Sequence, residues 1–187
     1  MKNTHVQRTN MKPADETIWY DELPTPIGTL VIVVDAQGLR EVLFASGKNH
    51  RPADPQWVRD AAKVAFARTQ LQDYFDGTRT TFDLPLHPIG TAFQLEVWNA
   101  LSDIPYGVTV SYAAIAQQIN KPKAVRAVGA ANGRNPIPIV VPCHRVIGSN
   151  GSLTGFGGGL PTKHFLLDLE KRVALGDGLF DGASARG

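Results

Sequence analysis

The chain contains a single cysteine, Cys143, and this count limits how the fold can be held together. One cysteine excludes a disulfide within the chain and any zinc site built from several cysteines. A length of 187 residues is enough to bury one good core or two small ones. We therefore expect a fold that is stabilised by packing, without a disulfide.

The surroundings of Cys143 leave its role open. It follows an apolar run, residues 137–141, which predicts a short buried strand, and His144 follows it directly. A thiol is a weak nucleophile until a base takes its proton, and a neighbouring histidine is a common base. A lone Cys-His pair is more often a buried structural cysteine beside a surface histidine. The rest of the chain has to decide between these interpretations.

The first half of the chain reads as a small α+β unit. Residues 17–20, 29–35 and 39–44 predict three strands joined by short turns, which is typical of an antiparallel meander. Residues 55–74 have helical spacing, and residues 81–86 resemble an edge segment. We place a domain boundary at Pro88-Ile-Gly90, so that residues 1–88 form the N-terminal domain, which shows no chemistry of its own.

The second half, residues 89–174, is mostly helical. Residues 91–101 form an amphipathic pattern, and Ser111 is suited to cap a helix over 112–118. A further helix over 124–132 ends at Gly133, and these two short helices predict a helix-turn-helix. The last helix is expected over 161–172. Residues 175–187, like the first dozen, look like a disordered tail.

Charge and side-chain size single out the helix at 124–132. Its outer face carries small residues, which fit either close approach to another surface or tight packing against another helix. Residues 104–167 contain no aspartate or glutamate, although the whole chain has a net charge of only +2. A basic surface without acids favours a polyphosphate partner, so we predict nucleic acid binding. The basic residues of this stretch are Lys121, Lys123, Arg126, Arg134, Arg145 and Lys163.

A glycine-rich loop follows the cysteine over residues 147–159. Five glycines between Gly151 and Gly159 expose backbone N–H and C=O groups, which suits a grip on a flat ligand. A flexible hairpin is the alternative, although five glycines are many for that purpose.

These residues resemble the O6-alkylguanine-DNA alkyltransferase family. The resemblance covers about residues 93–170 and keeps the order and spacing of several motifs; the first domain is similar more weakly, through Pro26-Ile-Gly-Thr-Leu. It implies a ribonuclease-H-like first domain, and irreversible, single-turnover transfer of an alkyl group from O6-alkylguanine in DNA to Cys143. Activity on O4-alkylthymine and the preferred alkyl size stay open. The motifs are Val110-Ser-Tyr112, Arg126-Ala-Val-Gly129, Asn135-Pro-Ile-Pro138, Pro142-Cys-His-Arg145 and the glycine-rich loop.

The resemblance also implies how the DNA is handled. The target base has to leave the duplex, because its O6 atom is buried there. Arg126 would enter the duplex in its place, and Tyr112 would help to rotate the nucleotide and bind guanine N3. The small face of the helix would lie in the minor groove. The DNA-binding residues expected on this basis are Lys123, Arg126, Ala127, Gly129, Ala130, Arg134 and Tyr112.

For the chemical step, the resemblance implies that His144 takes the thiol proton through a water and that Glu170 orients the imidazole. An imidazolium held in this way would lower the thiol pKa. Asn135 would tie the recognition helix to the segment before the cysteine. The carbonyls of Cys143 and Val146 would accept from the guanine amine, and the N–H of Gly157 would face O6. We place Phe156 and Arg145 on the substrate side as well.

Two departures affect only the substrate range: position 156 is Phe where the family often has Tyr, and position 157 is Gly where some members have Ser. No cysteine is available for the N-terminal zinc site or the cysteine-rich domain of some relatives, so we expect no metal, and we expect no cofactor. A plain helix-turn-helix regulator is the main alternative, since relatives that bind without repairing lack the nucleophilic cysteine. A thiol hydrolase is the second, and it would turn over repeatedly.

The unpaired thiol favours a reducing compartment, and residues 1–16 show no secretory signal. No apolar run reaches the length of a membrane span. We expect a cytoplasmic monomer that does not enter membranes, and cooperative binding along DNA stays open.

Overall fold

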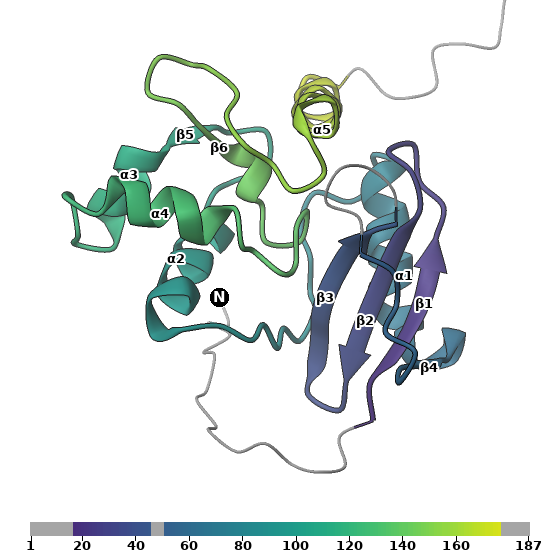
Figure 1. The fold of residues 1–187 in the computed structure, drawn as a ribbon. Helices are drawn as coiled ribbons and strands as arrows, with labels where there is room; N and C mark the ends of the chain where they lie inside the picture. Colours follow the sequence, from purple (N-terminus) through teal and green to yellow (C-terminus); the bar gives the residue numbers. More distant parts are fainter. Residues whose placement is uncertain (1–16, 46–50, 177–187) are drawn as a thin grey trace, which may run out of the picture.

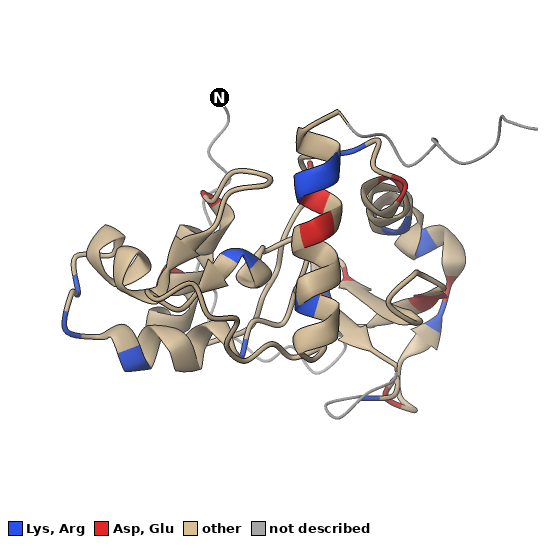
Figure 2. Ribbon diagram, turned by 90° about the horizontal axis from the view of Figure 1, so that it is seen from above, with Lys and Arg blue, Asp and Glu red and all other residues tan. Residues whose placement is uncertain are grey.

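The computed structural model describes residues 17–45 and 51–176 and has an α+β architecture, as expected. The expected disordered start and most of the expected tail lie outside these residues. A sheet-containing half is followed by a helical half, and helix α5 (Leu160–Ala174) lies between them (Figures 1 and 2). The buried apolar side chains of both halves form one continuous core.

The sheet of the first half has the predicted meander. Strands β1 (Trp19–Leu23), β2 (Leu30–Asp35) and β3 (Gly38–Phe44) pair antiparallel in sequence order. Their β-branched residues bury one face against helix α1 (Ala61–Phe75), which covers the sheet (Figure 1). Strand order is β3-β2-β1-β4, so β3 is the edge that faces the helical half.

The helix expected over residues 55–74 is shorter at its start. Residues Val58–Arg59 form strand β4, which pairs parallel to β1. Asp60 then caps α1, because its carboxylate accepts from the backbone N–H groups of Ala62 and Lys63 at 3.0 and 3.1 Å. Residues 81–86 form no strand. They contact the sheet through isolated hydrogen bonds, such as the one from Leu39 N to Pro85 O at 2.8 Å.

The helical half confirms the helix-turn-helix. Helix α2 (Ala92–Ser102) starts with a capping box at Thr91, and α3 (Tyr112–Gln118) starts at the predicted cap, Ser111. Helix α4 (Val125–Asn132) follows and ends at Gly133. A hydrogen bond from Trp98 Nε1 on α2 to the carbonyl of Ala131, 2.9 Å, fixes α4 against α2.

The predicted strand at residues 137–141 was wrong. These residues are largely buried, but they form a tight turn in which Val141 N donates to Ile137 O at 2.9 Å. Ile139 has φ 76°, and proline at 136, 138 and 142 removes the N–H donors that a ladder needs. The turn delivers the chain into the short 3-10 helix η1 (Cys143–Arg145) and then β6 (Val146–Ile147), which pairs parallel to β5 (Val110–Ser111).

Candidate active site

Cys143 begins the 3-10 turn η1 and is 4% exposed. Asn135, just after α4, supports the turn before it. The Asn135 side chain donates to Val141 O at 2.8 Å and accepts from Ile137 N at 3.0 Å. Asn135 therefore fixes the segment between α4 and Cys143, because both ends of its side-chain amide are hydrogen-bonded to that segment.

The Cys143 thiol is protonated in the resting protein. Burial raises its pKa to about 11, although a hydrogen bond from Asn135 and the charge of Lys163 act in the opposite direction. The expected lowering of the thiol pKa by an imidazolium is absent, because the neighbouring imidazole is itself uncharged. Any reaction at this sulfur near neutral pH requires a base.

His144 is buried, so the interpretation as a surface histidine was wrong. Its Nε2 lies 2.7 Å from Glu170 Oε1. Burial lowers the pKa of His144, and this outweighs the opposite effect of Glu170. The neutral ring therefore carries its proton on Nε2 and donates it to the carboxylate. Its Nδ1 is buried and has no hydrogen-bond partner among the described residues, so this lone pair is available to accept a proton.

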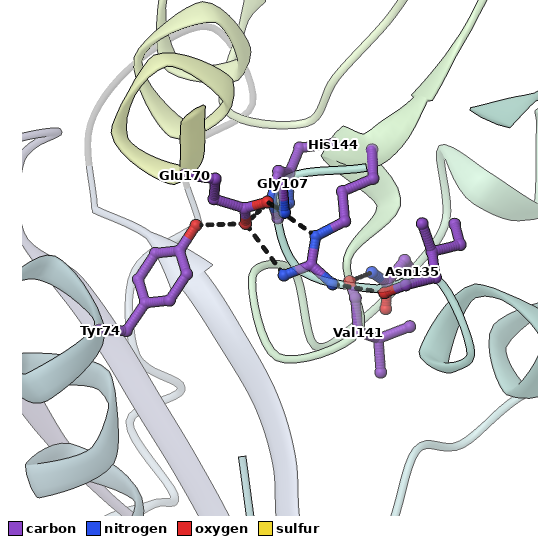
Figure 3. A network of polar contacts seen from close by, with 8 residues as sticks. Tyr74, Gly107, Asn135, Val141, His144 and Glu170 are labelled. Atoms are coloured by element: carbon purple, nitrogen blue, oxygen red, sulfur yellow. Dashed lines mark hydrogen bonds and ion pairs between the residues drawn. The ribbon is translucent and has the colours of Figure 1, made fainter. Parts of the chain in front are cut away.

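Glu170, on α5, is the centre of the polar network in Figure 3. Oε1 accepts from Tyr74 Oη at 2.8 Å, from His144 Nε2 and from Arg145 Nη2 at 3.0 Å. Oε2 accepts from Gly107 N at 3.0 Å and from Arg145 Nε at 2.9 Å. Burial acts to raise the pKa of Glu170, but the hydrogen bonds from His144 and Arg145, together with the charge of Arg145, prevail and lower it to about 2. Glu170 is thus a permanent anion that fixes the imidazole.

The structure places Arg145 away from the substrate side, contrary to our expectation. Its side chain is buried, binds Glu170 through two nitrogens and donates from Nη1 to Ile104 O at 2.6 Å. A buried guanidinium has to meet a carboxylate, and the nearest one lies on α5. Arg145 therefore belongs to the support of Glu170.

Lys163 is the second residue that the prediction wrongly placed on the basic surface. Its side chain is fully buried, and Nζ donates to the carbonyls of Val146 at 2.6 Å and Thr154 at 2.9 Å. The Val146 carbonyl, which we expected to bind the substrate, thus has one acceptor site already occupied and one left. Lys163 ties the glycine-rich loop to the strand after the cysteine.

The exposed basic residues are fewer than the sequence suggested. Lys121, Lys123, Arg126 and Arg134 are exposed, and Lys121 pairs with Glu96 of α2. Lys121 and Lys123 lie in the turn before α4, Arg126 on α4 and Arg134 just after it, and Figure 2 shows basic residues in blue on this part of the ribbon. On α4 itself, Ala127 and Ala130 are exposed while Val128 and Ala131 are buried. The two alanines of the outer face are therefore not used for helix packing, whereas Gly129 is half-buried beside the Tyr112 ring.

A groove of about 520 Å³ lies between α4 and the glycine-rich loop. Tyr112 lies in its wall, and its hydroxyl accepts from Thr154 Oγ1 at 3.0 Å, so the tyrosine is held against the loop. The residues that line the groove include Tyr112, Val125, Arg126, Gly129, Gly133 and residues 154–157.

A second hollow of about 330 Å³ reaches Cys143 itself. Phe156 and Gly157 line both hollows. The Phe156 ring is buried and meets His144 edge to face at 6.4 Å and Phe44 of β3 at 5.8 Å. A Cβ at Gly157 would meet no atom within 4 Å, so a side chain at that position would fit without strain.

Sequence reasoning missed three members of the site. Tyr74 and the backbone of Gly107 bind Glu170 from distant segments, and no local pattern marks such contacts. Lys163 was read as surface charge. Its place seven residues before Glu170 on one amphipathic helix is a signal that it shares the buried face, since that spacing is two helical turns.

None of the helices in the two described ranges is long and apolar enough to cross a membrane. The site as a whole defines a class of protein. It is a thiol transfer or hydrolysis centre in which a buried cysteine lies beside a neutral histidine that is held by an ionised glutamate.

Comparison with known proteins identifies the family. Residues 92–172 match the DNA binding domain of 6-O-methylguanine DNA methyltransferase, and residues 18–88 match its ribonuclease-like domain. The chain therefore belongs to the 6-O-methylguanine DNA methyltransferase family.

Individual relatives agree with this assignment. The methylated-DNA–protein-cysteine methyltransferase of Methanosarcina acetivorans is 50% identical over 153 residues, which cover 82% of this chain and 98% of that protein. The protein of the same name from Mycobacterium bovis is 47% identical over 165 residues, 88% of this chain and 99% of its own length. A crystal structure of Mycobacterium tuberculosis OGT in complex with DNA matches with a TM-score of 0.77 at 46% identity, over 83% of this chain and 94% of that one.

Proposed function

We propose that this chain repairs DNA directly, by moving the alkyl group of O6-alkylguanine in a duplex onto Cys143 in a single irreversible event. The observation that carries the proposal is the arrangement at the sulfur. The only thiol of the chain lies in a hollow that shares Gly133, Phe156 and Gly157 with the groove beside α4. It lies next to the neutral His144, whose Nδ1 has no hydrogen-bond partner among the described residues. Names of the relatives, which refer to methylated DNA and a protein cysteine, support the same activity.

DNA binding is assigned to the outer face of α4. Exposed alanines at 127 and 130 let the helix backbone come close to a minor groove, and Lys123 and Arg134 flank this face for contact with phosphates. Arg126 is exposed at the mouth of the groove and takes the place of the extruded base. The flipped guanine then lies between Tyr112 and the loop 154–157, where the Gly157 N–H faces O6.

The chemical step is a displacement at the alkyl carbon. A water passes the thiol proton to His144 Nδ1, and the thiolate sulfur forms a bond to the alkyl carbon as the bond from that carbon to O6 breaks. The electron pair of the broken bond stays on the guanine, which takes up one proton to become normal guanine within the DNA, while the imidazolium of His144 gives up the proton that it received. The ionised Glu170 stabilises the imidazolium, since it already accepts from Nε2 at 2.7 Å.

The protein is expected to act as a monomer in a reducing compartment, which is the cytoplasm. The site needs no second chain, because every member of the network around Glu170 comes from this one. A reducing environment keeps the single thiol available.

Intact-protein mass spectrometry after incubation with a duplex that holds O6-methylguanine tests the proposal. One methyl group should be added per molecule, on the peptide that contains Cys143, and Cys143→Ser should bind the duplex and gain no mass. Repeated turnover with an unmodified protein would favour a thiol hydrolase and refute the single-event mechanism.

A further inference from the structure

The first half of the chain reaches into the active site through one hydroxyl group. Tyr74 lies near the end of α1 and is fully buried, and its Oη donates to Glu170 Oε1 at 2.8 Å across 96 positions of sequence (Figure 3). Helix α1 packs on the sheet of the N-terminal half, whereas Glu170 belongs to α5. The active-site carboxylate is therefore held from both halves.

The direction of this hydroxyl is fixed by the rings around it. Phe75 and Tyr106 meet the Tyr74 ring edge to face, with centroids at 5.4 and 6.0 Å, and Phe82 lies at 5.6 Å. Burial, together with the charge and hydrogen bond of Glu170, raises the pKa of Tyr74 well above its ordinary value. The hydroxyl accordingly keeps its proton and remains a donor at any pH where the protein works.

Tyr74 and His144 donate to the same oxygen, Glu170 Oε1. Each additional donor withdraws electron density from a carboxylate oxygen and makes it a poorer acceptor for the others. An imidazolium is stabilised by the carboxylate it faces, so a weaker carboxylate leaves the imidazole less basic.

We propose that Tyr74 is a positioning residue that acts through Glu170 to keep His144 uncharged, so that Nδ1 is free to take the thiol proton. The other groups that face the imidazole are consistent with this role. Arg145 and Lys163 also lower the pKa of His144, after the larger effect of burial, and Glu170 alone raises it. The consequence of the proton transfer for DNA repair rests on the function proposed above, but the protonation state of His144 does not.

Tyr74→Phe is the test, because it removes the hydroxyl and keeps the ring. Two rates are measured against pH: single-turnover methyl transfer from DNA, and the reaction of Cys143 with iodoacetamide, which needs no DNA. The acid limb of both profiles should move to higher pH by about 0.5 unit, because only part of the effect of losing a hydrogen bond to the charged Glu170 is passed on to the imidazole. The plateau rate should not fall, since Gly107 and Arg145 still hold Glu170.

Tyr106→Phe is the matched control. The Tyr106 hydroxyl is buried in the same aromatic cluster but has no hydrogen-bond partner among the described residues. Its removal should leave the acid limb in place. An imidazole signal of His144 followed by NMR in the wild-type protein adds a measurement that needs no variant, and it should report a neutral ring at pH 7.

The outcomes separate the two proposals. A shifted iodoacetamide profile with no transfer from DNA would support the role of Tyr74 and refute the proposed function. A Tyr74→Phe variant whose rate falls equally at every pH, with an unmoved acid limb, would make Tyr74 merely structural. A charged His144 at pH 7 in the wild type would overturn the inference in either case.

Discussion

Replacement of Glu170 by glutamine tests the buried network most directly. The structure lowers the pKa of this carboxyl from 4.5 to about 2. Each unit between the unfolded and folded pKa is worth about 1.4 kcal/mol, so the ionised group contributes about 3 kcal/mol to the free energy of unfolding at pH 7. Glu170→Gln also leaves the buried Arg145 without a counter-charge, and breaking such a pair costs about 3–5 kcal/mol. Both routes predict a loss of at least about 3 kcal/mol.

The contribution of Glu170 to the free energy of unfolding should decrease as the pH falls. Because the folded pKa lies below the unfolded one, the contribution of Glu170 is complete above about pH 5 and is lost as the pH falls toward 2. Urea unfolding of the wild type and of Glu170→Gln should therefore differ by about 3 kcal/mol at pH 7 and by progressively less between pH 5 and pH 3.

A carboxylate elsewhere on α5 supplies the control. Asp168 is 55% exposed and pairs with His164 at 2.9 Å, so Asp168→Asn should change the free energy of unfolding by no more than about 0.5 kcal/mol. A difference below about 1 kcal/mol for Glu170→Gln at pH 7, or one that does not change between pH 5 and 3, would refute the reasoning.

Three further predictions concern the rest of the site. Arg126→Ala should slow transfer from duplex DNA much more than transfer from free O6-benzylguanine, because only the duplex requires extrusion of the base; an equal loss on both substrates would contradict a role in extrusion. Lys163→Met should raise the thiol pKa further and shift the iodoacetamide profile to higher pH, since the ammonium charge acts to lower that pKa, whereas Lys171→Met on the exposed side of α5 should leave the profile unchanged. Gly158→Ala should lower the thermal unfolding temperature, because its Cβ would lie 2.8 Å from the Phe44 ring. Gly157→Ala is the control and should leave this temperature unchanged, because its Cβ would meet nothing within 4 Å; equal temperatures for the two variants would mean that the Phe44 ring moves aside at no cost.

Local rules were sufficient for much of the fold. Helix α3 starts at Ser111 and α4 ends at Gly133 as predicted, because capping and chain reversal depend on residues close in sequence. The prediction of a strand at 137–141 was wrong, because it rested on hydrophobicity alone. The apolar residues of this segment are buried, but the prolines leave too few donors for pairing, and hydrophobicity alone does not separate a buried strand from a buried turn.

The site was predicted in part. The placement of Cys143, His144 and Glu170 together came from a resemblance, and the structure brings Glu170 to the imidazole. Arg145 and Lys163 were read as surface charges because a sequence shows the charge of a residue and not its burial. Their partners, a carboxylate on another helix and two backbone carbonyls, are set by tertiary packing, which no local pattern encodes.

The burial of Cys143 has a consequence for the lifetime of the unused protein. A molecule that is spent by one reaction is useful only if its sulfur survives until a lesion is met. Oxidants and stray electrophiles attack thiolates that are open to solvent. A sulfur that is 4% exposed and has a pKa raised to about 11 is shielded on both counts, and it becomes a nucleophile only once its proton is removed. Low exposure and a raised pKa thus favour survival of the reduced thiol until a lesion is met.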